Sequence, residues 1–140
     1  MRIVLDTNVV VSALIWSGAP YSLLQAAIER DVTLCTSPVL IAELTEVLQR
    51  SHLTPKLERA RGSVEQALAL YASLTVNVTP STVPRVVAAD PDDDHVLAAA
   101  VTADADLIVS GDRHLLALGA HKGIRVLNPA DAQRMILTQR

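Results

Sequence analysis

The stretch RIVLDTNVVVSALI, residues 2–15, contains the change of pattern on which the fold prediction depends. Its first four residues, RIVL, contain a short apolar run with two β-branched residues, which is typical of a strand buried on both faces of a parallel sheet. Asp6 ends this strand, and the segment TNVVVSALI (7–15) is expected to turn away from the sheet as a helix. The stretch therefore predicts one strand–helix unit of an α/β protein.

The rest of the chain repeats this alternation of strands and helices. Further strands are predicted at 32–36, 74–78, 106–110 and 124–127. Helices are predicted at 21–30, 38–50, 57–72, 91–103 and 113–119, and a last helix opens with the Asn-Pro pair at 128–129. We expect the α/β class, as a three-layer α/β/α sandwich around a central parallel sheet of about five strands, with one domain spanning residues 1–140.

The composition restricts the core and the environment of the protein. Half of the residues are hydrophobic but only three are aromatic, so the core must consist mainly of Val, Leu, Ile and Ala. The single cysteine, Cys35, excludes a disulfide framework, and no apolar run suggests a membrane span or a secretion signal. A cytoplasmic protein without membrane association is expected. The net charge of −3 argues at face value against nucleic-acid binding, although ten of the twelve basic residues are arginine, the better phosphate partner.

Two aspartates follow strands that are far apart in the sequence. Asp6 ends the first strand, and Asp112 follows the fourth strand after a Ser-Gly step. The carboxyl ends of parallel strands meet at one edge of a sheet, where sites gather, so we expect both side chains at that edge. Each could also be an ordinary turn or capping residue. Together, they favour a site.

Four further aspartates lie within five positions of the stretch VAADPDDDHVLAAA, residues 87–100. Asp90 can cap a helix and acids in its first turn suit the helix dipole. Asp94 lies about one turn inside the helix, where free N–H groups are mostly used up, so its charge is expected to need a cation. In the helix 38–50, Glu43 lies at the margin of the apolar stripe, but Glu46 is placed similarly, and periodicity alone gives Glu43 only a modest edge.

Four blocks of this sequence resemble the PIN-domain family in order and spacing. They are VLDTNVVVSALI, SPVLIAELTEVLQR, DPDDDHVLAAAV and ADLIVSGDRHLL, and the resemblance covers essentially the whole chain. The most similar group is the small bacterial PIN proteins related to VapC-like toxins. The resemblance implies that four acids form the catalytic and metal-binding set: Asp6, Glu43, Asp94 and Asp112. It further implies supporting positions at Thr7, Asn8, Asp92 and Ser110. Some relatives have another acid where this chain has His114, which bears on the binding of a second metal ion.

The function that the resemblance implies is metal-dependent hydrolysis of RNA. Oxygen ligands without a His/Cys cluster suit Mg²⁺ or Mn²⁺ rather than zinc. The resemblance also implies a cognate antitoxin protein and a homodimer. Arginines would hold the substrate. One candidate group is Arg113 with the neighbouring His114, and another is a strip of basic residues comprising Arg50, Lys56, Arg59 and Arg61. A solvated helix face would explain this strip equally well. With so few aromatic residues, base stacking is expected to play little part.

Two alternative functions are also considered. A haloacid-dehalogenase-like phosphatase also begins with a strand ending in Asp, but it needs a second Asp two positions later, where this chain has Asn8. The other alternative is a PIN fold that only binds RNA or a partner protein, because intact acidic residues do not by themselves prove turnover.

Overall fold

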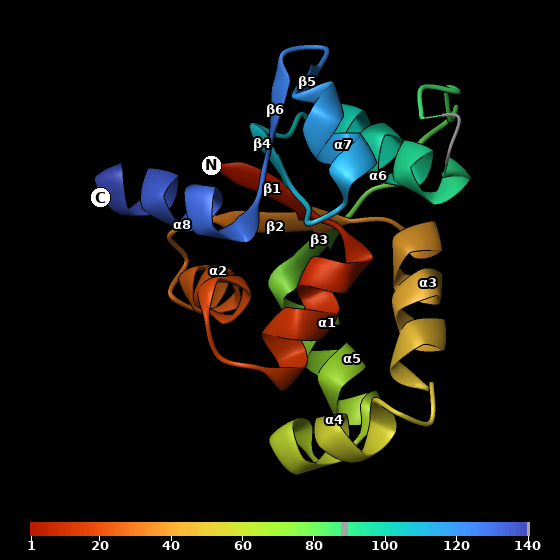
Figure 1. The fold of residues 1–140 in the computed structure, drawn as a ribbon, viewed down its shortest axis with the longest axis vertical. Coiled ribbons are helices and arrows are strands. Elements are labelled where there is room, and N and C mark those ends of the chain that lie inside the picture. The colour runs from red at the N-terminus through yellow and green to blue at the C-terminus, as the bar shows by residue number, and fades with distance from the viewer. Residues whose placement is uncertain (88–89, 140) are drawn as a thin grey trace.

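A computed structural model describes residues 1–87 and 90–139 of the chain. Its strands form one six-stranded sheet in the order β3-β2-β1-β4-β6-β5 (Figure 1). All neighbouring strands are parallel except the pair of β5 and β6. The bounds of the strands are β1 Arg2–Leu5, β2 Thr33–Thr36, β3 Thr75–Asn77, β4 Leu107–Val109, β5 Ala120–His121 and β6 Ile124–Leu127.

Helices connect these strands and cover the sheet. Their bounds are α1 Thr7–Ile15, α2 Ala19–Ile28, α3 Pro38–Leu48, α4 Thr54–Arg61, α5 Val64–Leu74, α6 Pro91–Thr102, α7 Arg113–Leu118 and α8 Pro129–Thr138. In Figure 1, α6 and α7 lie on one side of the sheet, and α1, α2 and α5 lie on the other. The expected three-layer α/β/α arrangement is therefore confirmed.

Alternate residues of the central strands belong to two separate cores. In β1, Ile3 and Leu5 pack with the cluster formed by α1, α2, α5 and α8, whereas Val4 packs with α6. In β4, Ile108 likewise faces the α6 cluster while its neighbours face the other. Successive side chains of a strand point to opposite faces, so a strand that is apolar at every position needs helices on both sides. This explains why the uninterrupted apolar strands of the sequence give a covered sheet.

One expectation about the elements was wrong, and one strand was not anticipated. The helix expected over 57–72 is two helices, because Gly62, at φ +90°, ends α4 and Ser63 starts α5 by accepting a hydrogen bond from the Gln66 N–H at 3.0 Å. The sheet has a sixth strand, β5, whose two residues are too few to produce a periodic signal. The other predicted strands and helices are present, with bounds that differ by a few residues.

No single helix within residues 1–87 and 90–139 is long and apolar enough to cross a membrane. The consecutive helices α1 and α2 meet that criterion only as a pair bent by 86°.

Candidate metal centre

Asp6 and Asp112 meet at the carboxyl edge of the sheet because β1 and β4 are neighbours. The backbone N–H of Asp6 donates to the Val109 carbonyl across this pair at 2.9 Å. The buried Ser110 hydroxyl joins the two acids, since it donates to Oδ2 of Asp6 at 2.7 Å and accepts from the backbone N–H of Asp112 at 2.9 Å. The expectation that the two aspartates share one edge of the sheet is confirmed, and Ser110 holds them in a fixed relation.

These aspartates also cap helices, so the two alternatives weighed from the sequence both apply. Oδ1 of Asp6 accepts from the Thr7 N–H at 2.8 Å at the start of α1. Oδ1 of Asp112 accepts from the N–H groups of His114 at 2.7 Å and Leu115 at 3.3 Å at the start of α7. No capping bond is made by Oδ2 of Asp112 among the described residues. The Oδ1 atom of Asp112 therefore orients this carboxylate at the start of α7.

Asp93, rather than Asp94, carries the third carboxylate to this edge. One carboxylate oxygen from each of Asp90, Asp93 and Asp112 lies within 4.8 Å of the other two, the only such group found in the described part of the chain. Asp90 is the N-cap of α6 and Asp93 is three residues further on. This is the spacing at which a capping residue and a first-turn side chain approach each other. This spacing was the one signal in the sequence that could have identified Asp90 and Asp93 as neighbouring carboxylates.

Asp93 is in an unfavourable environment unless it is protonated or bound to a cation. Its side chain is 3% exposed, and its Oδ2 atom has no hydrogen-bond partner among the described residues. Burial is the main cause that raises the pKa of the Asp93 carboxyl to about 7. The negative charges of Asp112, Asp90 and Asp6 raise this pKa further. A buried oxygen without a partner, facing other carboxylates, has the chemistry of a cation ligand.

The structure places Asp94 outside this group. Its Oδ1 atom accepts two backbone hydrogen bonds, from the Val86 N–H at 3.0 Å and the Val87 N–H at 2.8 Å. These donors offset the charge of Asp94, which was expected to need a cation. They belong to the irregular connection before α6, whose position relative to the helix no local pattern encodes. Asp94 therefore fastens that connection to α6.

Glu43 approaches the same edge from α3. The helix begins directly after β2, so its first turns lie beside the ends of β1 and β2, and Ser37 caps it through a bond from the Leu40 N–H at 3.3 Å. The pKa of the Glu43 carboxyl is raised, first by burial and then by the negative charges of Asp92, Asp6 and Asp90. A hydrogen bond with the Thr7 side chain opposes this rise. Glu46 is exposed, so the tertiary structure distinguishes two acids that periodicity could not.

Burial raises the pKa of the Asp6 carboxyl as well, against the hydrogen bonds from Ser110 and Thr7, and the charges of Asp112 and Asp90 act in the same direction as burial. Carboxylates from β1, α3, α6 and the β4–α7 turn thus act on one another electrostatically. Such a concentration of negative charge destabilises the metal-free fold, and a bound divalent cation would offset it.

Comparison with known proteins shows to which family this arrangement belongs. A family model described as a PIN domain matches residues 2–114. The chain belongs to the PIN-domain family. Members of this family are generally nucleases, and the assignment decides against the haloacid-dehalogenase-like alternative.

Similar proteins span most of this PIN domain. A protein of Methanocaldococcus jannaschii named Uncharacterized protein MJ1680 is 31% identical over 122 residues, which are 84% of this chain and 75% of that protein. A crystal structure of VapBC2 from Rickettsia felis, bound to a DNA fragment from their promoter, is similar with a TM-score of 0.63 and 17% identity. The crystal structure of FitAcB from Neisseria gonorrhoeae is similar with a TM-score of 0.57 and 22% identity. Each likeness covers 91% of this chain and 98% of the other, and at these identities it concerns the fold.

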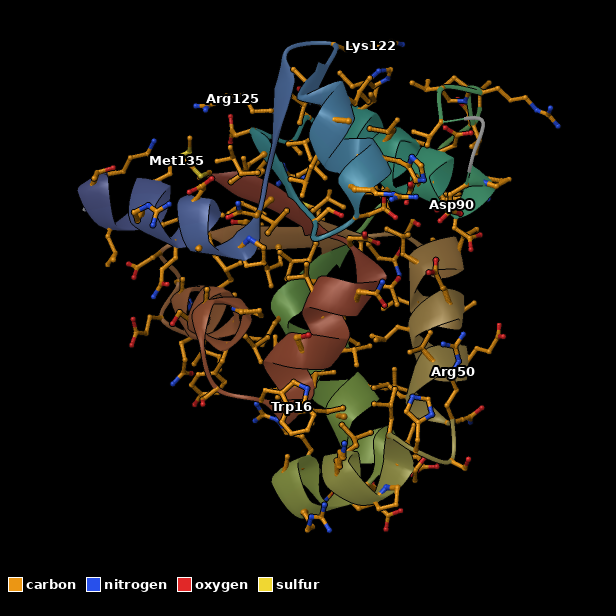
Figure 2. All side chains as sticks on the ribbon, viewed as in Figure 1. Trp16, Arg50, Asp90, Lys122, Arg125 and Met135 are labelled. Carbon is orange, nitrogen blue, oxygen red and sulfur yellow. The ribbon has the colours of Figure 1, made fainter. Side chains whose placement is uncertain are left out.

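The remaining predicted residues lie at different distances from the acids of the PIN domain. Arg113 and His114 follow Asp112 directly and are exposed at its rim, and Asn8 is exposed in the first turn of α1. Arg50 lies at the end of α3 opposite to the one near Asp90, as Figure 2 shows. Lys56, Arg59 and Arg61 lie on α4, and the guanidinium of Arg61 donates to the carbonyls of Leu14 at 2.9 Å and Ala13 at 3.4 Å. The candidate substrate-binding residues are therefore divided between a rim at α7 and a distant surface at α4, and Arg61 has a structural role.

Proposed function

We propose that this PIN protein is a divalent-metal-dependent ribonuclease that uses Mg²⁺ or Mn²⁺. The observation that carries the proposal is the buried, unpartnered Oδ2 atom of Asp93 beside the carboxylates of Asp90 and Asp112. All of these donors are oxygens, which are the ligands that Mg²⁺ and Mn²⁺ prefer. The proposed ligand set is Asp6, Glu43, Asp90, Asp93 and Asp112, in which Asp93 takes the place that the sequence resemblance assigned to Asp94.

The residues around this set would have separate tasks. Ser110 would keep the Asp6 carboxylate beside the backbone of Asp112, and the Thr7 side chain would orient Glu43. Asp92, exposed in the first turn of α6, adds negative charge near Glu43. A bound divalent cation supplies polarisation of a water molecule and stabilisation of charge on the leaving oxygen of a phosphodiester. Arg113 and His114, at the exposed rim, would contact the phosphate backbone.

We further propose that the chain is the toxin of a type II toxin–antitoxin pair, with a cognate antitoxin protein and a homodimeric assembly. The support is its likeness in sequence to VapC-like proteins and in fold to the VapBC2 and FitAcB structures. The alternative of a PIN module that binds RNA or protein without cleaving it predicts the same acidic site without turnover.

The deciding experiment is a cleavage assay on single-stranded RNA with purified protein. We expect cleavage in Mg²⁺ or Mn²⁺, no cleavage in EDTA, and none in the Asp6→Asn variant. Cleavage that persists in EDTA or in Asp6→Asn would point to a contaminating nuclease. RNA binding without cleavage by the wild-type protein would instead assign the non-catalytic alternative.

The thermal stability of the protein should depend on divalent metal and on pH together. The pKa of Asp93 is raised from its usual value near 4 to about 7, so the folded state holds this proton more tightly than the unfolded state. Metal-free protein should therefore lose stability as the pH rises from about 4 to about 7. Metal binding needs the ionised carboxylate, so the metal-induced rise in Tm should be small at pH ~5.5 and on the order of 10 °C at pH ~8 with metal in large excess over its Kd.

Differential scanning fluorimetry at the two pH values measures this dependence. The matched control is Asp104→Asn, because Asp104 is exposed beyond the opposite end of α6 and its positive φ of 54° suits asparagine. This variant should behave as the wild type. A metal-induced shift of equal size at both pH values would contradict the role given to Asp93.

A further inference from the structure

We propose that Trp16 and the adjoining face of α4 form a second contact site for single-stranded RNA, remote from the acids. The inference rests on the proposed ribonuclease function and deepens it. It also reverses the expectation that base stacking plays little part, because the single tryptophan of the chain lies where stacking and phosphate contacts can be combined.

Trp16 is an exposed aromatic ring next to exposed positive charge. It is the C-cap of α1, where its backbone N–H donates to the Ser12 carbonyl at 2.8 Å, and 49% of it remains exposed. The ammonium group of Lys56 lies 5.0 Å from the centroid of its ring. A shallow hollow of about 280 Å³ lies here, lined by Ile15, Trp16, Lys56, Arg59 and Ala60.

Arg61 attaches α4 to the end of α1 and so fixes the two parts of this surface relative to each other. Arg61 bonds to the last carbonyls of α1 and lies with its guanidinium carbon 5.9 Å from the centroid of the Tyr21 ring. A second hollow of about 260 Å³, lined by residues that include Trp16, Tyr21 and Arg61, adjoins the first. The attachment of α4 to the end of α1 fixes the backbone positions of Lys56 and Arg59 relative to Trp16.

The chemistry of this surface suits a polyanion with flat, apolar groups. No acidic residue is among those that line the two hollows. An exposed indole offers a stacking face for any base, and neighbouring Lys and Arg side chains can neutralise backbone phosphates. An acidic peptide would use the charges, but it would leave the indole face without a matching planar group. RNA therefore fits better than an acidic protein segment.

The position of the surface suits a strand of RNA that also reaches the acids. Asp6 caps the start of α1 and Trp16 its end, so the ten residue steps from one to the other correspond to about 15 Å along the helix axis. When a phosphodiester lies at the acids, its flanking nucleotides could thus contact Trp16. This contact would add binding affinity at a place away from the carboxylates, which repel the RNA phosphates.

The test measures RNA binding in the cleavage-deficient Asp6→Asn background. Oligouridine should quench the fluorescence of Trp16, the only tryptophan. With labelled oligouridine and fluorescence anisotropy, Trp16→Ala should weaken binding by about tenfold, and Trp16→Phe should retain part of the affinity. The Lys56→Gln/Arg59→Gln double variant should lower the slope of log K against log[salt] by about 1.4, or 0.7 for each phosphate contact.

The matched control is the Lys122→Gln/Arg125→Gln double variant, which removes the same charges from the β5–β6 hairpin, far from Trp16 in Figure 2. It should leave binding unchanged, and melting curves should confirm that all variants fold. Equal RNA affinity with and without Trp16→Ala in the Asp6→Asn background would overturn this inference alone, whereas a wild-type protein that neither binds nor cleaves RNA would overturn the proposed function too. Quenching of Trp16 by oligoglutamate but not by oligouridine would assign the surface to an acidic protein partner and also overturn the inference.

Discussion

Replacing Asp93 with asparagine is expected to lower RNA cleavage by on the order of a thousandfold, because a lost metal ligand removes several kcal/mol of transition-state stabilisation. The variant should bind Mn²⁺ far more weakly than the wild type in isothermal titration. It should also be more stable than the wild type without metal at pH ~8, since the Asp93 carboxylate is buried among negative charges and its pKa is raised to about 7.

Asp92→Asn is the matched control for this prediction. Asp92 precedes Asp93 in the first turn of α6 and is exposed, whereas Asp93 is buried. The control should change cleavage and metal affinity by less than about threefold, as expected for an exposed charge screened by water. Equal losses in both variants would mean that the general negative charge of this turn, and not a ligand at Asp93, controls the activity.

Asp94→Ala is expected to cost about 2–4 kcal/mol of unfolding free energy, a fall in Tm of roughly 10 °C. The reason is structural, because the substitution leaves the N–H groups of Val86 and Val87 without their acceptor in a partly or fully buried position. Chemical and thermal unfolding of the metal-free protein measure this loss. Metal affinity should fall much less than in Asp93→Asn.

The conservative variant Asp94→Asn separates the two roles that Asp94 could have. Its side-chain amide oxygen can still accept both backbone hydrogen bonds, so it should recover most of the stability lost in Asp94→Ala and retain metal binding. If Asp94→Asn abolishes metal binding while Asp93→Asn preserves it, the ligand set is the one implied by the sequence resemblance.

Much of the fold was predictable because it depends on local patterns. The apolar strands and the capped helix starts at Ser37 and Asp90 depend on residues close to one another in the chain, and the structure contains them. The break at Gly62 was missed because the apolar residues of α4 and α5 continue one helical pattern across it, although the Gly-Ser pair is itself a stop and start signal. The meeting of Asp6 with Asp112 was also predictable, since it follows from the rule that parallel strands end at one edge.

The sequence by itself determined the layered α/β fold, the edge of the sheet where the acids gather, and an oxygen-only set of candidate ligands. The tertiary structure alone decided which of two adjacent aspartates faces that set. Neighbouring residues of a helix point about 100° apart, so only one of them can face the sheet edge. The irregular connection before α6 brings its N–H groups to Asp94 and leaves Asp93 facing Asp90 and Asp112. That choice depends on contacts between α6 and segments outside the helix, which no periodicity within the helix records.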